Sequence, residues 1–417
     1  MSDLSHVLCN PGLLKLELML HGIRLPTQRR AEHEGAVTGH ALFGSAGDVD
    51  LLLPGGTWAS VPVVRGLVQS TPYTLVEEGR SLFVTATDSS ERALVKLRPP
   101  SKVFSYRTST GLPFGKFGTV HGPYMAISPT NHCSFLQTSA QCRFCGVGEE
   151  GATHEPIPVD DIVEAIQIAR SEHPIDMVYL SVGALGTDDG GVLFLEPYVA
   201  EIKKHFDVLV AIDALPPSDN RWIDHAYAMG VDSVSYNLEI FDAERFHRIC
   251  PGPAETIGRE RFLEALEYAA TVFPSGGTTC HLIVGLEPMA STRRGIDTLT
   301  AMGVLPILPL YRPFKGRDMR RDEAAEHFNA SRAELTSLHS HLYTAVRDHR
   351  INLNLVRDIA IVTTPLEGRF LSKNSGVLEA LQNKAMGTRW GRRTSAYMSD
   401  LRRALRVRYV EEMSSGA

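Results

Sequence analysis

The pattern of hydrophobic and polar positions changes near residue 120. Before it, apolar residues form short runs at 49–53, 81–86 and 93–97, separated by glycine and proline, which is typical of strands joined by turns. After it, strand-like runs alternate with segments whose apolar residues recur at helical spacing. We therefore predict a strand-rich N-terminal domain over residues 1–120, followed by a domain of successive βα units.

The strands predicted for the second domain lie at 124–127, 177–180, 208–212, 233–239, 280–284 and 304–310. A later helical pattern begins at Ser331 with Glu334 three residues on, the signature of a capping box. About six βα units close most economically into a full or partial barrel, so the predicted fold class is α/β. The predicted core barrel covers 121–350, and a C-terminal extension over 351–417 contains a strand at 359–362 and a basic helix.

The strand at 124–127 leads into a stretch that holds three of the six cysteines. Cys133, Cys142 and Cys145 are separated by eight and then two residues. Soft thiolate ligands select zinc, copper(I) or iron–sulfur clusters, and a two-residue gap allows two sulfurs to reach one metal site. Three thiolates suit a cubane cluster in which one iron is left for a small molecule.

Two other interpretations of these cysteines remain open. A structural zinc needs four protein ligands, and the fourth would be His132, His154, Cys250 or Cys280. Alternatively, the cysteines pack as small hydrophobic residues. Outside the cysteine stretch, Cys250 and Cys280 are expected to be packed thiols rather than a radical relay or ligands of an auxiliary cluster.

The segment Cys142-Arg143-Phe144-Cys145 resembles the Cys-x-aromatic-Cys ending found in the radical S-adenosylmethionine (radical SAM) superfamily. The first gap departs from that pattern, since three residues are commonest there and this chain has eight. The resemblance implies that Cys133, Cys142 and Cys145 bind a [4Fe-4S] cluster and that Phe144 packs near the purine of S-adenosylmethionine (SAM). It also implies an electron donor such as flavodoxin or ferredoxin.

The strand end at 236–239, Tyr-Asn-Leu-Glu, and a Glu-Arg pair on the next helix resemble the biotin-synthase-like branch of this superfamily. The resemblance implies that Asn237 and Glu239 bond the ribose or amino group of SAM and that Arg261 bonds its carboxylate. A zwitterion needs one anion and one fixed cation, which agrees with these residue types. Arg259 is the rival for the arginine role. In the competing interpretation Glu239 caps a loop and Arg261 is solvated.

Two further strand ends resemble SAM contacts of the superfamily. Ile283 and Gly285 match a stretch that lies near adenine, although the acid that follows, Glu287, comes one residue early. Around Ser181 and Gly183 the glutamate of many relatives is missing, so backbone carbonyls there would serve the methionine amino group, unless this segment is a plain turn.

Composition limits the partners and the compartment. The formal net charge of -6 gives no basic field, which argues against nucleic acid as the main partner. There is no run of about 18 apolar residues and no pattern of a signal peptide, so we expect a cytoplasmic protein without membrane spans. Six cysteines in this arrangement do not predict a disulfide framework.

Substrate contacts are less defined. Arg312 and Lys315 either face the barrel mouth and bind an anionic group or lie on a solvated loop. The arginine-rich tail over 389–408 is expected to form a helix that docks on the barrel.

The resemblance implies an enzyme that cleaves SAM reductively and abstracts hydrogen from a small-molecule substrate. The lack of a second cysteine cluster favours a small substrate. The alternatives are a radical SAM enzyme that modifies a peptide or protein, and an iron–sulfur or zinc protein without catalysis. A fainter resemblance, to radical SAM proteins encoded beside nitrilases, names no substrate.

Overall fold

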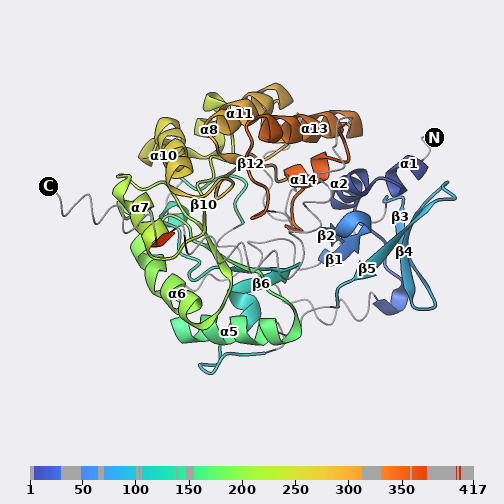
Figure 1. Cartoon of the computed structure of the whole chain (residues 1–417), viewed down its shortest axis with the longest axis horizontal. Helices are drawn as coiled ribbons and strands as arrows, with labels where there is room; N and C mark the ends of the chain where they lie inside the picture. The colour runs from blue at the N-terminus through green and yellow to red at the C-terminus, as the bar shows by residue number, and fades with distance from the viewer. Residues whose placement is uncertain are drawn as a thin grey trace.

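The computed structural model of the chain describes residues 4–29, 48–63, 70–99, 103, 106–137, 140–146, 155–311, 330–356, 359–372, 401, 403 and 404. These residues form two sheets, one of five strands in the order β2-β1-β5-β4-β3 and one of seven in the order β12-β11-β10-β9-β8-β7-β6. Figure 1 shows the five-stranded sheet at one end of the molecule, beside the larger α/β part. The predicted α/β class with a smaller strand-rich N-terminal part is confirmed.

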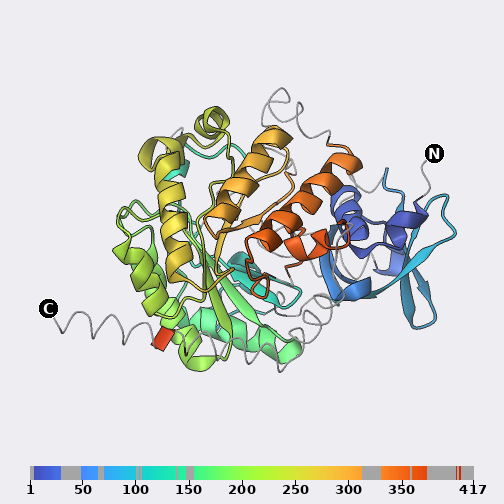
Figure 2. The same cartoon turned by 45° about the horizontal axis from the view of Figure 1, so that its top comes forward.

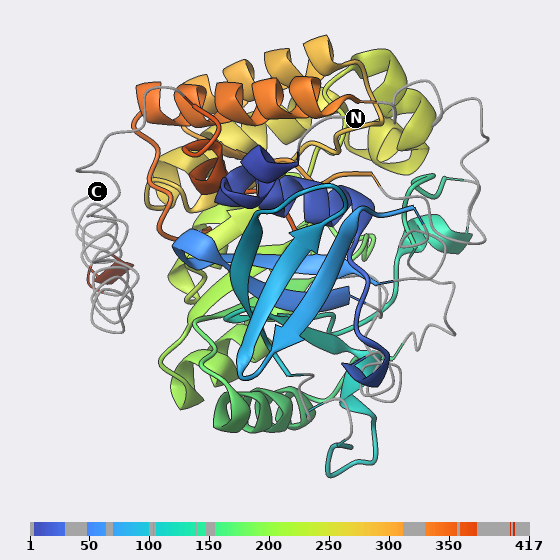
Figure 3. The ribbon, with the colours of Figure 1, turned by 90° about the vertical axis from the view of Figure 1, so that its right-hand side faces the viewer.

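All pairs in the N-terminal sheet are antiparallel. Its elements are α1 (Ser5–Leu8), α2 (Pro11–His21), β1 (Asp48–Leu53), β2 (Thr57–Pro62), β3 (Tyr73–Glu78), β4 (Ser81–Ala86) and β5 (Arg92–Leu97). Proline at the first position and the Asn10 side chain, which accepts from two backbone N–H groups, start α2. Leu14 and Leu18 of α2 are buried in one cluster with the sheet residues Leu51 and Val61. Figure 3 shows this helix lying over the blue strands.

Most strands of the larger sheet are parallel and follow one another in chain order. Its strands are β6 (Gly118–His121), β7 (Tyr124–Ile127), β8 (Met177–Ser181), β9 (Leu209–Asp213), β10 (Ser233–Ser235), β11 (Thr278–His281) and β12 (Leu305–Ile307). From β7 to β12 every strand pairs in parallel with the next one in the chain, while β6 pairs antiparallel with β7. Within the described residues no pairing joins β12 to β6, so the described strands form a partial barrel.

Helices cover the outside of this sheet (Figure 2). They are α5 (Val159–Glu172), α6 (Val192–His205), α7 (Arg221–Ala228), α8 (Ala243–Ile249), α9 (Pro251–Thr256), α10 (Arg259–Val272), α11 (Met289–Ala301) and α13 (Arg332–Asp348). The short α14 (Pro365–Gly368) packs against α13 and α2. The capping box predicted at the start of α13 is present, with Ser331 and Glu334 as its members. The strand predicted at 359–362 does not form. Instead Thr363 makes a single antiparallel bridge to Leu308.

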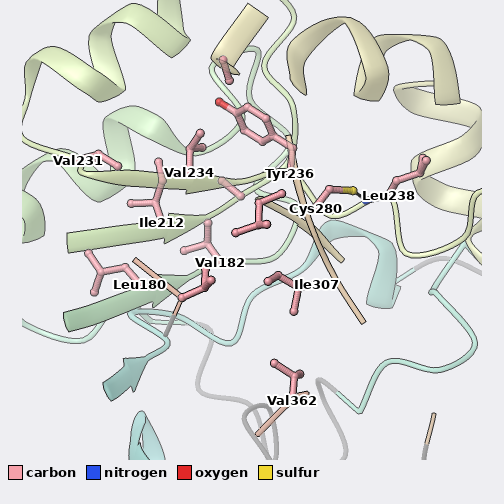
Figure 4. Close-up of a cluster of buried hydrophobic side chains, with 14 of the residues drawn as sticks. Leu180, Val182, Ile212, Val231, Val234, Tyr236, Leu238, Cys280, Ile307 and Val362 are labelled. Carbon is pink, nitrogen blue, oxygen red and sulfur yellow. Dashed lines mark hydrogen bonds between the residues drawn. The ribbon is translucent and has the colours of Figure 1, made fainter. Parts of the chain in front are cut away.

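Apolar and polar side chains alternate along the barrel strands. Leu180 of β8, Ile212 of β9, Val234 of β10 and Tyr236, which directly follows β10, are buried in the main core (Figure 4). The positions between them carry polar groups that hydrogen-bond from strand to strand, such as Ser181 to Asp213. Because successive side chains point to opposite faces of a sheet, the apolar set faces the helices and the polar set faces the barrel interior.

The C-terminal segment is packed on the N-terminal part. Lys15 of α2 is completely buried and forms an ion pair of 3.0 Å with Glu367 of α14. The Ser60 N–H of β2 donates to the Ala360 carbonyl at 2.9 Å. The division into domains at residues 120 and 350 stays a prediction, because these contacts join the first and last parts of the chain.

Candidate functional site

The first cysteine of the loop is held at the end of β8. The Ser134 N–H donates to the Ala184 carbonyl at 2.8 Å. A Cβ atom added to Gly183 would lie 2.7 Å from Cys133 Cβ, closer than side-chain atoms normally approach. Glycine at position 183 therefore lets Cys133 lie against the strand end, which gives this predicted site residue a steric role.

The second half of the loop docks where α8 meets α9. The Arg143 N–H donates to the Ile249 carbonyl, and the Gly252 N–H donates to the Ala140 carbonyl, both at 2.9 Å. These two bonds run between antiparallel segments and lie on either side of Cys250. The sequence offered no sign of this pairing, because it joins segments about a hundred residues apart.

The result is a contact between two cysteines. The buried thiol of Cys250 donates a hydrogen bond to the sulfur of Cys142. This bond lowers the pKa of Cys142, although burial acts in the opposite direction. The same bond, then burial and the charges of Cys142, Glu239 and Cys145, raise the pKa of Cys250 well above its ordinary value. Cys250 is packed in the main core, as expected, and it also lies beside two of the loop cysteines.

The donor set of the loop fits an iron–sulfur cluster. Its three cysteines offer thiolates, the ligands that hold such clusters in proteins. Among the described residues, no three Cys, His, Asp or Glu side chains are grouped around one point as ligands of a single metal ion. A cluster is larger than one ion, and its cysteines bind different irons. The assignment of Cys133, Cys142 and Cys145 as ligands stays a prediction.

Glu239 is the most strained residue near these thiols. It follows β10 with a φ of 66°, a left-handed conformation that costs a non-glycine residue on the order of 1–3 kcal/mol. Its N–H donates to the His281 carbonyl at 2.9 Å, and its carbonyl accepts from the Ile283 N–H at 2.8 Å. Its buried carboxylate oxygen Oε2 has no hydrogen-bond partner among the described residues. Burial first, then the charges of Asp213 and Cys142, raise the pKa of Glu239 well above its usual range.

An uncompensated carboxyl group of this kind is costly in a protein interior. Strained, pKa-shifted side chains of this kind cluster at functional sites. Glu239 lies near Cys142, so the structure brings one predicted SAM contact together with a predicted cluster ligand.

Asn237 belongs to a polar network across β8 to β11. Its amide donates to Asp213 Oδ1 at 2.8 Å, and its Oδ1 accepts from Ser235 Oγ at 2.6 Å and from the His281 N–H at 2.9 Å. Ser181 Oγ donates to the other oxygen of Asp213 at 2.9 Å. Burial raises the pKa of Asp213 to about 6, opposed by its hydrogen bonds. The network fixes the orientation of the Asn237 amide.

Asp213 was missed by the sequence interpretation. A signal existed, because an acid directly ends the apolar strand β9, at the edge where barrel enzymes place functional groups. His281 was also left without a role. Burial lowers the pKa of its ring to about 4, so the ring is neutral near pH 7.

The predicted adenine contacts lie beside Glu239. A parallel bridge joins Glu239 to Leu282, and the following Ile283 is buried. Gly285 has a φ of 104°, which requires glycine. Phe144 is partly buried against the barrel core.

The structure does not bring the predicted arginine to this group. In the described contacts, the Arg261 guanidinium donates to the Pro217 carbonyl at 2.8 Å and to Asn220 Oδ1 at 2.6 Å. Arg259 donates to the Phe241 carbonyl at 3.0 Å and lies over that ring at 4.5 Å. The carboxylate-binding role of Arg261, with Arg259 as its rival, stays a prediction.

Several candidates lie outside the described residues, namely Arg312, Lys315, His154 and most of the arginine-rich tail. Of that tail, Arg403 is described, and it docks on the barrel by donating to Asp232 at 2.8 Å. None of the helices in the described part of the chain is long and apolar enough to span a bilayer.

Residues 127–289 match the family model described as Radical SAM superfamily. The chain is 28% identical over 210 residues to bacteriochlorophyllide c C-7(1)-hydroxylase of Chlorobaculum limnaeum, with 45% of this chain and 52% of that protein covered. It therefore spans about half the length of this relative. The matched segment, which is less than half of the chain, is thus a radical SAM superfamily domain.

Solved structures with a similar arrangement include methylornithine synthase, at 15% identity and a TM-score of 0.43, covering 58% of this chain and 72% of that one. Another is the FeFe-hydrogenase maturase HydG of Carboxydothermus hydrogenoformans, at 13% identity and a TM-score of 0.44, covering 54% and 52%.

Proposed function

We propose that this protein is a radical SAM enzyme in which Cys133, Cys142 and Cys145 hold a [4Fe-4S] cluster and Glu239 binds SAM. The observation that supports it most is the strained Glu239, whose buried carboxyl group has an oxygen without a partner close to Cys142. The amino group and the ribose hydroxyls of SAM are donors that would satisfy this oxygen.

When bound, the cluster and SAM supply a carbon-centred radical by one-electron reductive cleavage. The residues of this chain bind and orient. Asp213 and Ser181 hold Asn237, and Gly183 lets the cysteine loop lie close to the sheet. Ile283 and Gly285 line the adenine side in this proposal.

The substrate in this proposal is a small molecule that loses a hydrogen atom from carbon. The polar side chains of the barrel interior, among them Asp213 and Ser235, would contact its polar groups. The similar protein of Chlorobaculum limnaeum is named a hydroxylase, a reaction that also begins at a C–H bond.

The proposal includes a low-potential electron donor, such as flavodoxin or ferredoxin, and a location in the cytoplasm. The location rests on the expectation from the sequence that the six cysteines do not form a disulfide framework.

The test is anaerobic reconstitution, followed by measurement of iron, sulfide and 5′-deoxyadenosine in the presence of dithionite and SAM. We expect the parent protein to bind the cluster and release 5′-deoxyadenosine, and Cys142→Ala to lose both. Cys9→Ala is the matched control, because Cys9 is exposed and lies near Glu91 in the N-terminal part. A parent protein that holds metal without cleaving SAM would contradict the proposal and favour a non-catalytic metal protein.

A further inference from the structure

Cys250 is positioned as part of the cysteine loop. The two backbone hydrogen bonds that join 140–143 to 249–252 fix it opposite Cys142. The contact is tight, because a Cβ added to Gly252 would lie 2.6 Å from the Ala140 carbonyl oxygen and equally close to the Phe135 ring. Its place beside Cys142 therefore follows from the backbone and not from a rotamer alone.

The surroundings of Cys250 differ from those of the other buried cysteine. The Cys250 thiol donates to the sulfur of Cys142, and Cys145 and Glu239 lie close enough for their charges to act on it. Cys280 has backbone partners instead, since its sulfur accepts from the Leu238 N–H at 3.4 Å and donates to the His281 carbonyl at 3.5 Å. Both thiols are buried in the main core, but of these two Cys250 is the one that contacts a cysteine of the loop.

The position of Cys250 bears on the number of thiolates that can reach the cluster. Three loop thiolates leave one iron of a four-iron cluster without a protein ligand, and thiolate is the ligand that such iron prefers. Among the described cysteines, Cys250 is the additional thiol in contact with the loop. Close to these cysteines, an oxygen of Glu239 lacks a hydrogen-bond partner, so a polar ligand could bind at the same place.

We propose that Cys250 is a fourth thiolate ligand, which completes the cluster while SAM is absent and leaves it when SAM binds. This inference rests on the proposed function. No electron is transferred in the exchange. On binding iron the thiol releases one proton to solvent, and when SAM takes the iron the iron–sulfur bond to Cys250 breaks and the thiolate regains a proton. The hydrogen bond from Cys250 to Cys142 is then restored. The device would protect the open iron from other small ligands.

The test compares the reconstituted parent protein with Cys250→Ala and Cys280→Ala, using ¹³C-cyanide as the probe for an open iron. In the reduced proteins without SAM, we expect a ¹³C hyperfine coupling in Cys250→Ala and none in the parent or in Cys280→Ala. The apparent Kd of SAM should fall in Cys250→Ala, by about tenfold if the thiolate occupies the iron in about nine of ten molecules.

A second measurement does not depend on the variant. Mössbauer spectra of the ⁵⁷Fe-labelled parent should show one iron becoming distinct only when SAM is added. A distinct iron before SAM, or cyanide coupling in the parent as strong as in Cys250→Ala, would overturn the assignment and leave Cys250 as a hydrogen-bond donor. If either of these results is obtained and Cys142→Ala still loses the cluster, the proposed function stands while the role of Cys250 does not. A parent protein that takes up no cluster would overturn both proposals.

Discussion

At the scale of single residues, the candidate site is built from positions that are unfavourable for folding alone. Glu239 combines a left-handed backbone with a buried carboxyl group, and Gly183 has no room for a side chain. Such features persist where the surrounding structure enforces them and where a ligand compensates for them. The sequence indicated both residues through a family resemblance, but their strain and close packing depend on contacts between distant segments.

For Glu239, we predict that Glu239→Gln weakens SAM binding by roughly 1.5–3 kcal/mol, the usual worth of hydrogen bonds to charged groups. The free energy of unfolding should not fall, because the change removes an ionisable group from a buried place. Calorimetric titration and urea unfolding measure the two effects. Glu244→Gln on the exposed face of α8 is the control, and equal SAM affinity in both variants would refute the role of Glu239.

For Gly183, we predict that Gly183→Ala lowers the iron content after reconstitution, since the new methyl group displaces Cys133 from the end of β8. Gly146→Ala is a matched control within the same loop region, where an added Cβ meets no atom within 4 Å. Iron and sulfide analysis compares the two. Equal iron in both variants would show that the position of Cys133 does not depend on Gly183.

At the scale of elements, periodicity predicted the strands and helices that have one buried face. β7, β8, β9 and α13 lie close to their predicted places, because their apolar residues repeat at the spacing of the element. The strand predicted at 359–362 failed, since an apolar run also fits a buried irregular segment. Cys250 and Asp213 were not assigned to the site, because register between distant segments brings them there.

The contact between α2 and α14 gives a prediction at this scale. Lys15 is buried and bonds Glu367 and the Ile359 carbonyl. Breaking a buried ion pair leaves an uncompensated charge, so Lys15→Met should lower the free energy of unfolding by about 3–5 kcal/mol. Lys15→Met combined with Glu367→Gln should recover part of that loss. Urea unfolding measures both, and an equal loss in the single and double variants would exclude a charge effect.

At the scale of the whole molecule, the two sheets are joined through a second buried pair. Asp50 of β1 accepts from the His121 ring of β6 at 3.1 Å and from the Gly122 N–H at 2.8 Å, and Arg98 donates to the Gly122 carbonyl. Burial raises the pKa of Asp50, but His121, Gly122 and Arg98 outweigh it and the net pKa is lowered. For His121, burial lowers the pKa and so does the charge of Arg98. Asp50 and Asp48 raise it by more, so the net pKa of His121 is raised.

These directions fix the sign of the pH dependence. The contribution of Asp50 to stability is complete above its ordinary pKa of 3.8 and is lost as the pH falls through its lower folded value. The contribution of His121 is complete below its ordinary pKa of 6.5 and is lost as the pH rises through its higher folded value. The pair therefore stabilises the joined sheets most between about pH 4 and 6.5.

Unfolding free energies measured across this range should show a maximum that flattens in His121→Gln. The exposed His205 pairs with Glu201 on α6, and His205→Gln should leave the profile unchanged. A parent profile with the same shape as that of His121→Gln would mean that the pair does not contribute to the joining of the two sheets.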